Sequence, residues 1–253
     1  MIGPGLPSGG ALGGAAAGPG LPPAGRAPAR EHHLPVTRTA RYATLGAAGP
    51  GVRQVWFVLH GFGQLARYFV RNFAALDDGQ RLIVAPEALS RFYVGEVDGS
   101  GSAQARVGAT WMTREDRLTE IDDYVSYLDA LHQHVMKEVA AAHPTAAKIE
   151  AVGLGFSQGV ATACRWAQRG RARLDRLVLW AGAVPPEIES DDDFARFRAL
   201  DLTFVLGERD PFAGPSRVEE LEARLRARSV PYRLIRFDGG HELDAGVLQG
   251  LAG

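Results

Sequence analysis

The sequence of 253 residues predicts an α/β fold, in which helices cover both faces of a mostly parallel sheet. Short apolar runs at 53–60, 81–86 and 148–156 have the length and composition of strands that are buried on both faces. Helical stretches separate these runs, and parallel strands require such long crossover connections. The composition, 46% hydrophobic and 23% charged, is that of a globular domain.

In the first half of the chain, the patterns that predict secondary structure are weak at the start and stronger from residue 53 on. The stretch 34–46 alternates weakly and is interpreted as a first strand. The strand 53–60 leads into a helical stretch at 65–76, and Pro86 ends the strand 81–86. The segment 87–114 is rich in Gly and Ser, so we interpret it as an ordered loop over the top of the sheet.

The clearest helix predicted covers 118–139. Its apolar residues are three and four positions apart, which places them on one face of a helix. His143 precedes Pro144 and ends the helix, because a residue before proline disfavours helical backbone. The apolar face consists of Leu118, Ile121, Val125, Leu128, Leu131, Val135 and Val139.

The second half repeats the alternation without an evident internal repeat, so a single domain is the simplest interpretation. Its predicted strands are 148–156, 174–182, 202–210 and 232–241, and its predicted helices are 157–168, 191–199, 215–229 and a small final helix in 244–253.

The N-terminal stretch differs from the rest in composition. Of residues 1–30, 22 are Gly, Ala or Pro, and such a stretch cannot offset the entropy of ordering itself. The sequence therefore predicts a disordered extension at 1–33 and a folded domain at 34–253. The extension lacks the basic start and apolar core of a secretory signal.

Charge, cysteine content and hydropathy exclude several function classes. A net charge of −1 gives no reason to expect nucleic acid as a partner. The lone Cys164 excludes an intrachain disulfide and is interpreted as a buried packing residue. His132 and His134, two apart on a helix, suit a metal site badly. With no apolar run long enough to span a bilayer, we expect a cytoplasmic protein without an integral membrane segment.

The stretch "GLGFSQGV" at 153–160 carries the strongest chemical signal. Ser157 stands between a predicted strand and a predicted helix, with Gly155 and Gly159 two positions away on either side. Such a sharp turn needs small residues there, lifts the hydroxyl above the sheet and presents helix N–H groups to an oxyanion. On its own the motif also fits a small polar residue in a tight turn, and the strand–turn–helix context favours a nucleophile.

A serine nucleophile needs a base and a group that orients the base. In this architecture an acid and a histidine follow the serine, each after a later strand. Asp210 and His241 follow the predicted strands in that order. The rivals are weaker. Glu208 lies closer to the strand, and Asp201 lies at its opposite end. His32 and His33 lie near the N-terminus, and the long helix carries His132, His134 and His143. An ordinary turn Asp and a loop His remain the alternatives.

The stretch "HGFGQ" at 60–64 follows the first buried strand. Two glycines there let the backbone turn an N–H inward, as the second half of an oxyanion hole requires. We interpret His60 as a structural residue that bonds this loop.

In their order, "LHGFGQ", "GLGFSQG", "LGERDPF" and "GGHEL" resemble the motifs of α/β-hydrolases. The Gln after the serine and the "HGFG" stretch are similar to the phospholipase/carboxylesterase branch, which includes acyl-protein thioesterases. The resemblance covers about 50–245 and implies the α/β-hydrolase fold and a serine esterase without cofactor or metal. It also implies a triad of Ser157, Asp210 and His241, and an oxyanion hole formed by the N–H groups of Phe62 and Gln158. Val160 departs from the family, which often has a second Gly there.

The function expected is hydrolysis of small-molecule carboxylic esters through an acyl-enzyme. The alternatives are a thioesterase, lysophospholipase or peptidase on the same fold, or an inactive hydrolase fold that binds a ligand. We expect Phe92, Tyr93 and Trp111 to line the acyl pocket, with core anchoring as the alternative for Phe92 and Trp111. The sequence leaves the choice between a monomer and a homodimer open.

Overall fold

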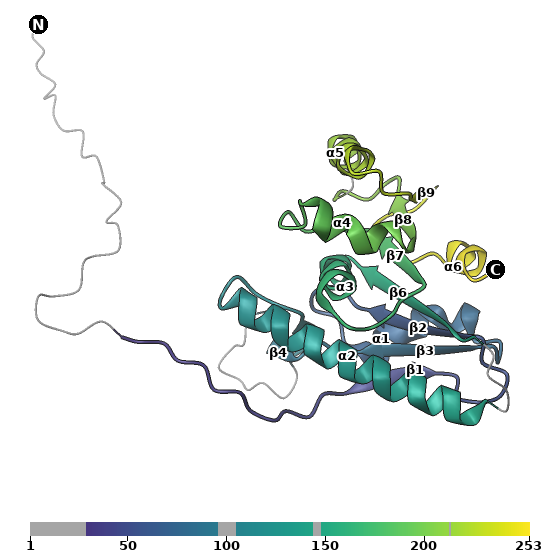
Figure 1. The fold of residues 1–253 in the computed structure, drawn as a ribbon, viewed down its shortest axis with the longest axis horizontal. Coiled ribbons are helices and arrows are strands. Elements are labelled where there is room, and N and C mark those ends of the chain that lie inside the picture. Colours follow the sequence, from purple (N-terminus) through teal and green to yellow (C-terminus); the bar gives the residue numbers. More distant parts are fainter. Residues whose placement is uncertain (1–28, 96–104, 144–147, 213) are drawn as a thin grey trace, which may run out of the picture. The chain divides into compact units, whose positions relative to one another are not determined.

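A computed structural model describes residues 29–95, 105–143, 148–212 and 214–253 (Figure 1). The chain divides into two units, Met1–Arg38 and Thr39–Gly253, and residues 29–38 form neither helix nor strand. The elements all belong to the second unit and are, in order, β1 (Tyr42–Leu45), β2 (Gln54–Leu59), α1 (Ala66–Phe69), η1 (Val70–Leu76), β3 (Arg81–Pro86), β4 (Ser90–Tyr93), β5 (Val107–Thr110), α2 (Arg117–Ala142), β6 (Glu150–Phe156), α3 (Gln158–Arg169), β7 (Arg176–Trp180), α4 (Asp191–Arg198), β8 (Asp201–Gly207), α5 (Pro215–Ala227), β9 (Arg233–Phe237) and α6 (Ala245–Leu251).

Seven strands form the central sheet in the order β1-β3-β2-β6-β7-β8-β9. All neighbours pair in parallel except β1, which runs antiparallel to β3 at the edge. β2 and β6 lie in the middle, so the loops that follow them meet at the same edge of the sheet. The predicted mostly parallel α/β sheet is confirmed.

Helices cover both faces of this sheet (Figure 1). Alternate residues of β2 face opposite sides: Phe57 belongs to a core cluster with residues of α2, α3, α4 and α5, and Trp56 belongs to one with residues of α1, η1 and α6. Both side chains are fully buried. The continuous apolar run of this strand therefore reflects burial on both of its faces.

The first strand is shorter than predicted, since only Tyr42–Leu45 pair with β3. Tyr42 lies opposite Pro86, the last residue of β3, so the residues before Tyr42 have no strand beside them. The weak alternation in 34–41 therefore does not produce a strand.

Two helix predictions need correction. The stretch 65–76 is a four-residue helix followed by the 3₁₀-helix η1, whose buried residues Val70, Phe73 and Leu76 are three positions apart, as that helix type favours. The long helix α2 forms as expected, but Leu118 is 59% exposed and does not belong to its buried face.

The segment 87–114 contains regular structure that the sequence did not predict. β4 and β5 pair as an antiparallel hairpin, whose tip lies outside the described residues. Gly108 in β5 lies against the loop after β2: a Cβ there would come within 2.6 Å of the Gly63 carbonyl oxygen. The short alternation and this glycine conceal the strands in the sequence. The other predicted strands and helices form within a few residues of their expected bounds.

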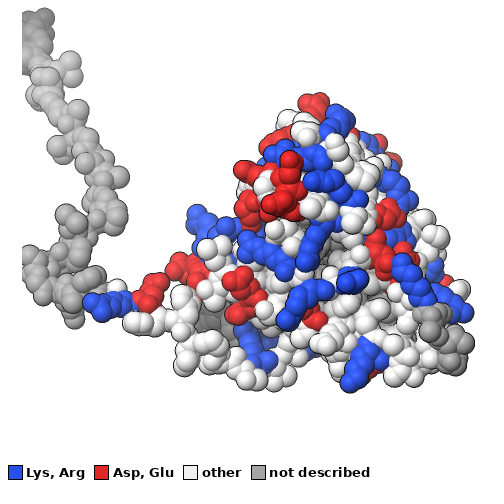
Figure 2. All heavy atoms as spheres, in the orientation of Figure 1, with Lys and Arg blue, Asp and Glu red and all other residues white. Residues whose placement is uncertain are grey.

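Residues 1–28 lie outside the described part, so the extension at 1–33 stays a prediction. In the described part, no helix is long and apolar enough to cross a membrane. Figure 2 shows Lys and Arg side chains interspersed with Asp and Glu over the face that carries α2, α3 and α4, in agreement with the net charge of −1.

Candidate active site

Ser157 occupies a strained turn between β6 and α3. Its φ of 55° and ψ of −116° are rarely adopted by a residue with a side chain, and such strain costs about 1–3 kcal/mol. The flanking glycines permit the turn. A Cβ on Gly155 would lie 2.3 Å from the Gly159 carbonyl oxygen, and one on Gly159 would lie 2.2 Å from the Leu59 carbonyl oxygen. Any larger residue at either position would open the turn.

A chain of hydrogen bonds joins the three residues predicted to act together. His241 Nε2 lies 2.9 Å from Ser157 Oγ, and His241 Nδ1 lies 2.8 Å from Asp210 Oδ2. Since a carboxylate only accepts, Nδ1 carries the proton and Nε2 is free to accept one from the serine. The three side chains follow β6, β8 and β9, whose carboxyl ends meet at one edge of the sheet.

The surroundings fix the orientation of His241. Its ring lies between Phe156 and Phe212, with centroid distances of 5.1 and 5.0 Å. Asp210 is buried, and its second carboxylate oxygen accepts the N–H of Phe212 at 2.8 Å. The carboxylate and both rings therefore limit the rotation of the imidazole. The rivals named from the sequence do not join this group: Glu208 is exposed, and Asp201 pairs with Arg233.

The backbone near Ser157 offers two N–H groups for an oxyanion. Gln158 is the first residue of α3, where an N–H has no partner within its own helix. In the loop after β2, Gly61 N donates to Gln64 Oε1 at 2.8 Å and Gly63 N to the Ala109 carbonyl at 2.9 Å. Among the described residues, the N–H of Phe62 has no partner. These are the two donors that the family resemblance implies, and their role as an oxyanion hole stays a prediction.

Comparison with known proteins decides the family. The family model described as "Serine hydrolase (FSH1)" matches residues 54–243, which contain all of these groups. The chain belongs to the FSH1 serine hydrolase family. No curated protein matches this FSH1-family chain.

Solved structures share the fold of this FSH1-family hydrolase at low identity. Esterase PE8 is 19% identical, with a TM-score of 0.60 over 85% of this chain and 97% of that one. The Zea mays acyl-protein thioesterase 2 is 16% identical, with a TM-score of 0.60 over 85% and 96%. A carboxylesterase from Mesorhizobium loti is 19% identical, with a TM-score of 0.60 over 85% and 95%. Together they show the α/β-hydrolase fold.

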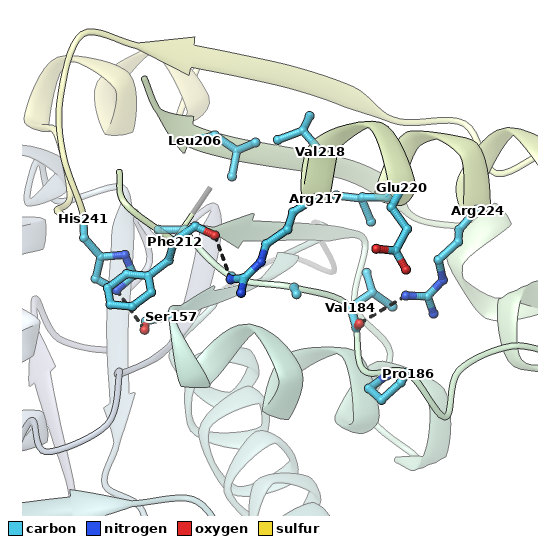
Figure 3. Close-up of a pocket in the computed structure, with 14 residues that line it drawn as sticks. Ser157, Val184, Pro186, Leu206, Phe212, Arg217, Val218, Glu220, Arg224 and His241 are labelled. Carbon is cyan, nitrogen blue, oxygen red and sulfur yellow. Dashed lines mark hydrogen bonds between the residues drawn. The ribbon is translucent and has the colours of Figure 1, made fainter. Parts of the chain in front are cut away.

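A cavity of about 460 Å³ opens at Ser157 and His241 and extends along α5 (Figure 3). Its lining is mostly apolar near the serine and carries charged groups from α5. It is formed by Ser157, Ala181, Gly182, Ala183, Val184, Pro186, Leu206, Phe212, Arg217, Val218, Glu220, Leu221, Arg224 and His241.

The aromatic residues predicted to line the pocket are not among the residues around this cavity. Trp111 is 2% exposed and donates its indole N–H to the His60 carbonyl at 2.8 Å, which fits the anchoring alternative. Phe92 stacks on Phe62 with centroids 4.9 Å apart, and Tyr93 is 47% exposed. Contact of Phe92 and Tyr93 with a substrate stays a prediction.

The sequence did not predict a polar network on the side of Ser157 opposite α5. The Gln158 side chain donates to Thr110 Oγ1 at 2.9 Å and to the Met112 carbonyl at 3.1 Å, and it accepts the N–H of Trp111 at 3.2 Å. Gln158, which is predicted to supply an oxyanion N–H, is thereby tied to the end of β5. The Gln after the serine was a signal, but its partners lie 46–48 positions away in the chain.

His60 holds the base of the loop that follows β2. It is fully buried, its Nδ1 donates to the Gly61 carbonyl at 2.8 Å, and its Nε2 accepts the N–H of Ala88 at 3.1 Å. Burial lowers its pKa below the ordinary value of 6.5, so the ring is neutral. The structural role predicted for His60 is confirmed.

A buried carboxylate supports the hairpin. Glu87 accepts hydrogen bonds from Arg41 and Arg91, both at 2.6 Å, and from the N–H of Ala66 at 3.3 Å. Burial alone would raise the pKa of Glu87, but the two guanidinium groups outweigh it and lower the pKa. Glu87 therefore remains charged and links β4 and α1 to the residue that precedes β1.

Cys164 is fully buried on α3, and burial raises the pKa of its thiol to about 12. The thiol is therefore protonated and inert, as predicted for a packing residue. Within the described ranges, no group of three or more His, Cys, Asp or Glu side chains could hold a metal ion.

Proposed function

We propose that this protein is a carboxylic-ester hydrolase in which Ser157, His241 and Asp210 form the catalytic triad. The observation that carries the proposal is the unbroken chain of hydrogen bonds from Ser157 Oγ through His241 to Asp210, at the mouth of a cavity. The membership in a serine hydrolase family supports it.

The mechanism follows from the geometry. His241 Nε2 takes the proton of Ser157 as its oxygen attacks the ester carbonyl. Asp210 holds the required tautomer and stabilises the imidazolium that forms. The N–H groups of Phe62 and Gln158 stabilise the oxyanion, and His241 then protonates the leaving alcohol. Water activated by the same histidine releases the acid and restores the serine.

The surroundings of Ser157 suit this chemistry. The strained backbone is kept by its glycines and by the bond from Ser157 N to the Trp180 carbonyl at 2.9 Å. The N–H donors of the oxyanion hole belong to a helix end and a bonded loop, so they need no rearrangement as charge develops.

The test is a panel of p-nitrophenyl esters from acetate to palmitate, with a thioester of matched acyl chain beside each. The proposal expects saturable hydrolysis of at least one ester, with a burst of p-nitrophenol if deacylation is slow. Faster turnover of every thioester than of its matched ester would assign the protein to thioesterases instead. Absence of turnover on the whole panel would contradict the proposal.

A further inference from the structure

Arg217 lies in the cavity beside the candidate nucleophile, and its side chain is exposed. It projects from the first turn of α5 into the cavity, nearer to Ser157 than Glu220 is (Figure 3). Its Nη1 donates to the Phe212 carbonyl at 3.1 Å, and its other N–H donors have no protein partner among the described residues. Among the described residues it forms no ion pair.

The other arginine of the cavity shows the contrast. Arg224 donates to the carbonyl oxygens of Val184, Pro185 and Ile188 at 3.4, 3.2 and 2.9 Å. It therefore supports the loop after β7, which forms the opposite wall of the cavity. Arg224 thus makes three bonds of this kind, whereas Arg217 makes one, to the Phe212 carbonyl.

Helix stability does not explain Arg217. The N-terminal turn of a helix favours acidic side chains, because the helix dipole is positive there. The first turn of α5 holds no acidic residue, and a cation stands in it. Glu220 is three positions further on the same helix, yet its carboxylate does not pair with Arg217 in the described structure.

From these contacts we infer that the substrate carries a carboxylate on the part that occupies this cavity, and that Arg217 binds it. The inference rests on the proposed ester hydrolysis and names its substrate class. Near Ser157 the walls are apolar, so the carboxylate is separated from the reacting ester by a short apolar spacer. A guanidinium binds a carboxylate through two parallel hydrogen bonds, and the helix N-terminus adds to the attraction.

Two substrate pairs test this, because the cavity could hold either side of the ester. Mono-p-nitrophenyl adipate and its methyl-capped counterpart differ by a carboxylate in the acyl part. The second pair consists of p-hydroxyphenylacetate and its methyl ester, each with the phenol butyrylated. Its members differ by a carboxylate in the alcohol part. The readout is the ratio of kcat/KM within each pair, after correction for spontaneous hydrolysis. We expect the wild-type protein to favour the carboxylate by about tenfold in one pair.

The variants assign that ratio to Arg217. Arg217→Gln should bring it close to one, and Arg217→Lys should keep part of it. Glu220→Gln should raise the ratio by about two- to threefold, because the substitution removes a carboxylate that repels the carboxylate of the substrate. The matched control is Arg226→Gln on the same helix, since Arg226 is 66% exposed and pairs with Glu222 outside the cavity. Its ratio should equal that of the wild type.

Salt supplies an independent check, because the Debye length falls from about 30 Å at 0.01 M to about 3 Å at 1 M. The ratio should shrink over that range. Hydrolysis of the neutral esters without a preference for the carboxylate in either pair overturns the inference and leaves the proposed ester hydrolysis standing. A preference that survives in Arg217→Gln also overturns it. If none of the four esters is cleaved, both the inference and the proposed ester hydrolysis are overturned.

Discussion

The two sides of Ser157 are built in opposite ways. On the side of β5, polar groups are buried and satisfied: Gln158, Trp111 and His60 donate to or accept from named partners. On the side of α5, a cavity of about 460 Å³ separates the serine from the helix, and the exposed side chains of Arg217 and Glu220 face it without an ion pair among the described residues. In the reaction that we propose, one side fixes the reacting groups and the other leaves room for the substrate. Substitutions on the two sides should therefore fail in different ways.

The largest effect is expected where the two sides meet. Ser157→Ala should lower kcat on the best ester by about a million-fold, because the members of a triad act as a unit. Removing the hydroxyl leaves the fold intact, so the melting temperature should change little. Retention of even about a tenth of the activity would show that another group is the nucleophile.

Asp210→Asn should come next, with a loss of about ten thousand-fold in kcat, because an amide at this position favours the wrong tautomer of His241. The matched control is Glu208→Gln, which changes an exposed carboxylate just before Asp210 and should leave kcat unchanged. Equal losses in the two variants would contradict the assignment of the acid.

On the bonded side, Trp111→Phe should reduce stability more than selectivity. It removes the donor to the His60 carbonyl and leaves that buried oxygen unpaired, which costs about 1–3 kcal/mol. Thermal melts should show the loss, while the ratio of kcat/KM between short and long acyl esters should stay as in the wild type. A shifted acyl-chain profile with unchanged stability would return Trp111 to the pocket wall.

His60→Gln should have the smallest effect on turnover, and it should change the dependence of stability on pH. Burial lowers the pKa of His60 below 6.5, so the unfolded chain takes up the proton first as the pH falls. The free energy of unfolding of the wild type should therefore decline below about pH 6.5 and continue to decline until the folded-state pKa is passed.

The variant should show a shallower decline between about pH 7.5 and 5.5 in urea titrations. A residual slope is expected, because burial also lowers the pKa of His132. Identical slopes in the variant and the wild type would mean that His60 contributes nothing to the pH dependence of the free energy of unfolding.

The sequence predicted those parts of the candidate site that depend on residues close together in the chain or on the order of the strands. Gly155 and Gly159 are needed by one turn, and the order of Ser157, Asp210 and His241 follows from the order of the strands. Continuous apolar runs such as that of β2 predicted the buried sheet, because both of its faces are covered.

The sequence did not predict what depends on distant partners. The hairpin β4–β5 is short, and its place is set by contacts of Gly108 and Ala109 with the loop after β2. Trp111 is an aromatic residue in a Gly-rich segment, and only the His60 carbonyl beside it distinguishes an anchor from a pocket wall. The cavity lies instead beside α5, where the sequence shows an ordinary charged helix.

Labelling with a fluorophosphonate probe asks whether Ser157 is an activated nucleophile, on which the whole proposed mechanism depends. Such a probe reacts with a serine only when a base takes its proton. We expect one adduct per chain, found by mass spectrometry on the peptide that contains Ser157, and no adduct on Ser157→Ala or on the denatured wild type. Folded wild-type protein that stays unlabelled, or an adduct on another residue, would contradict that mechanism.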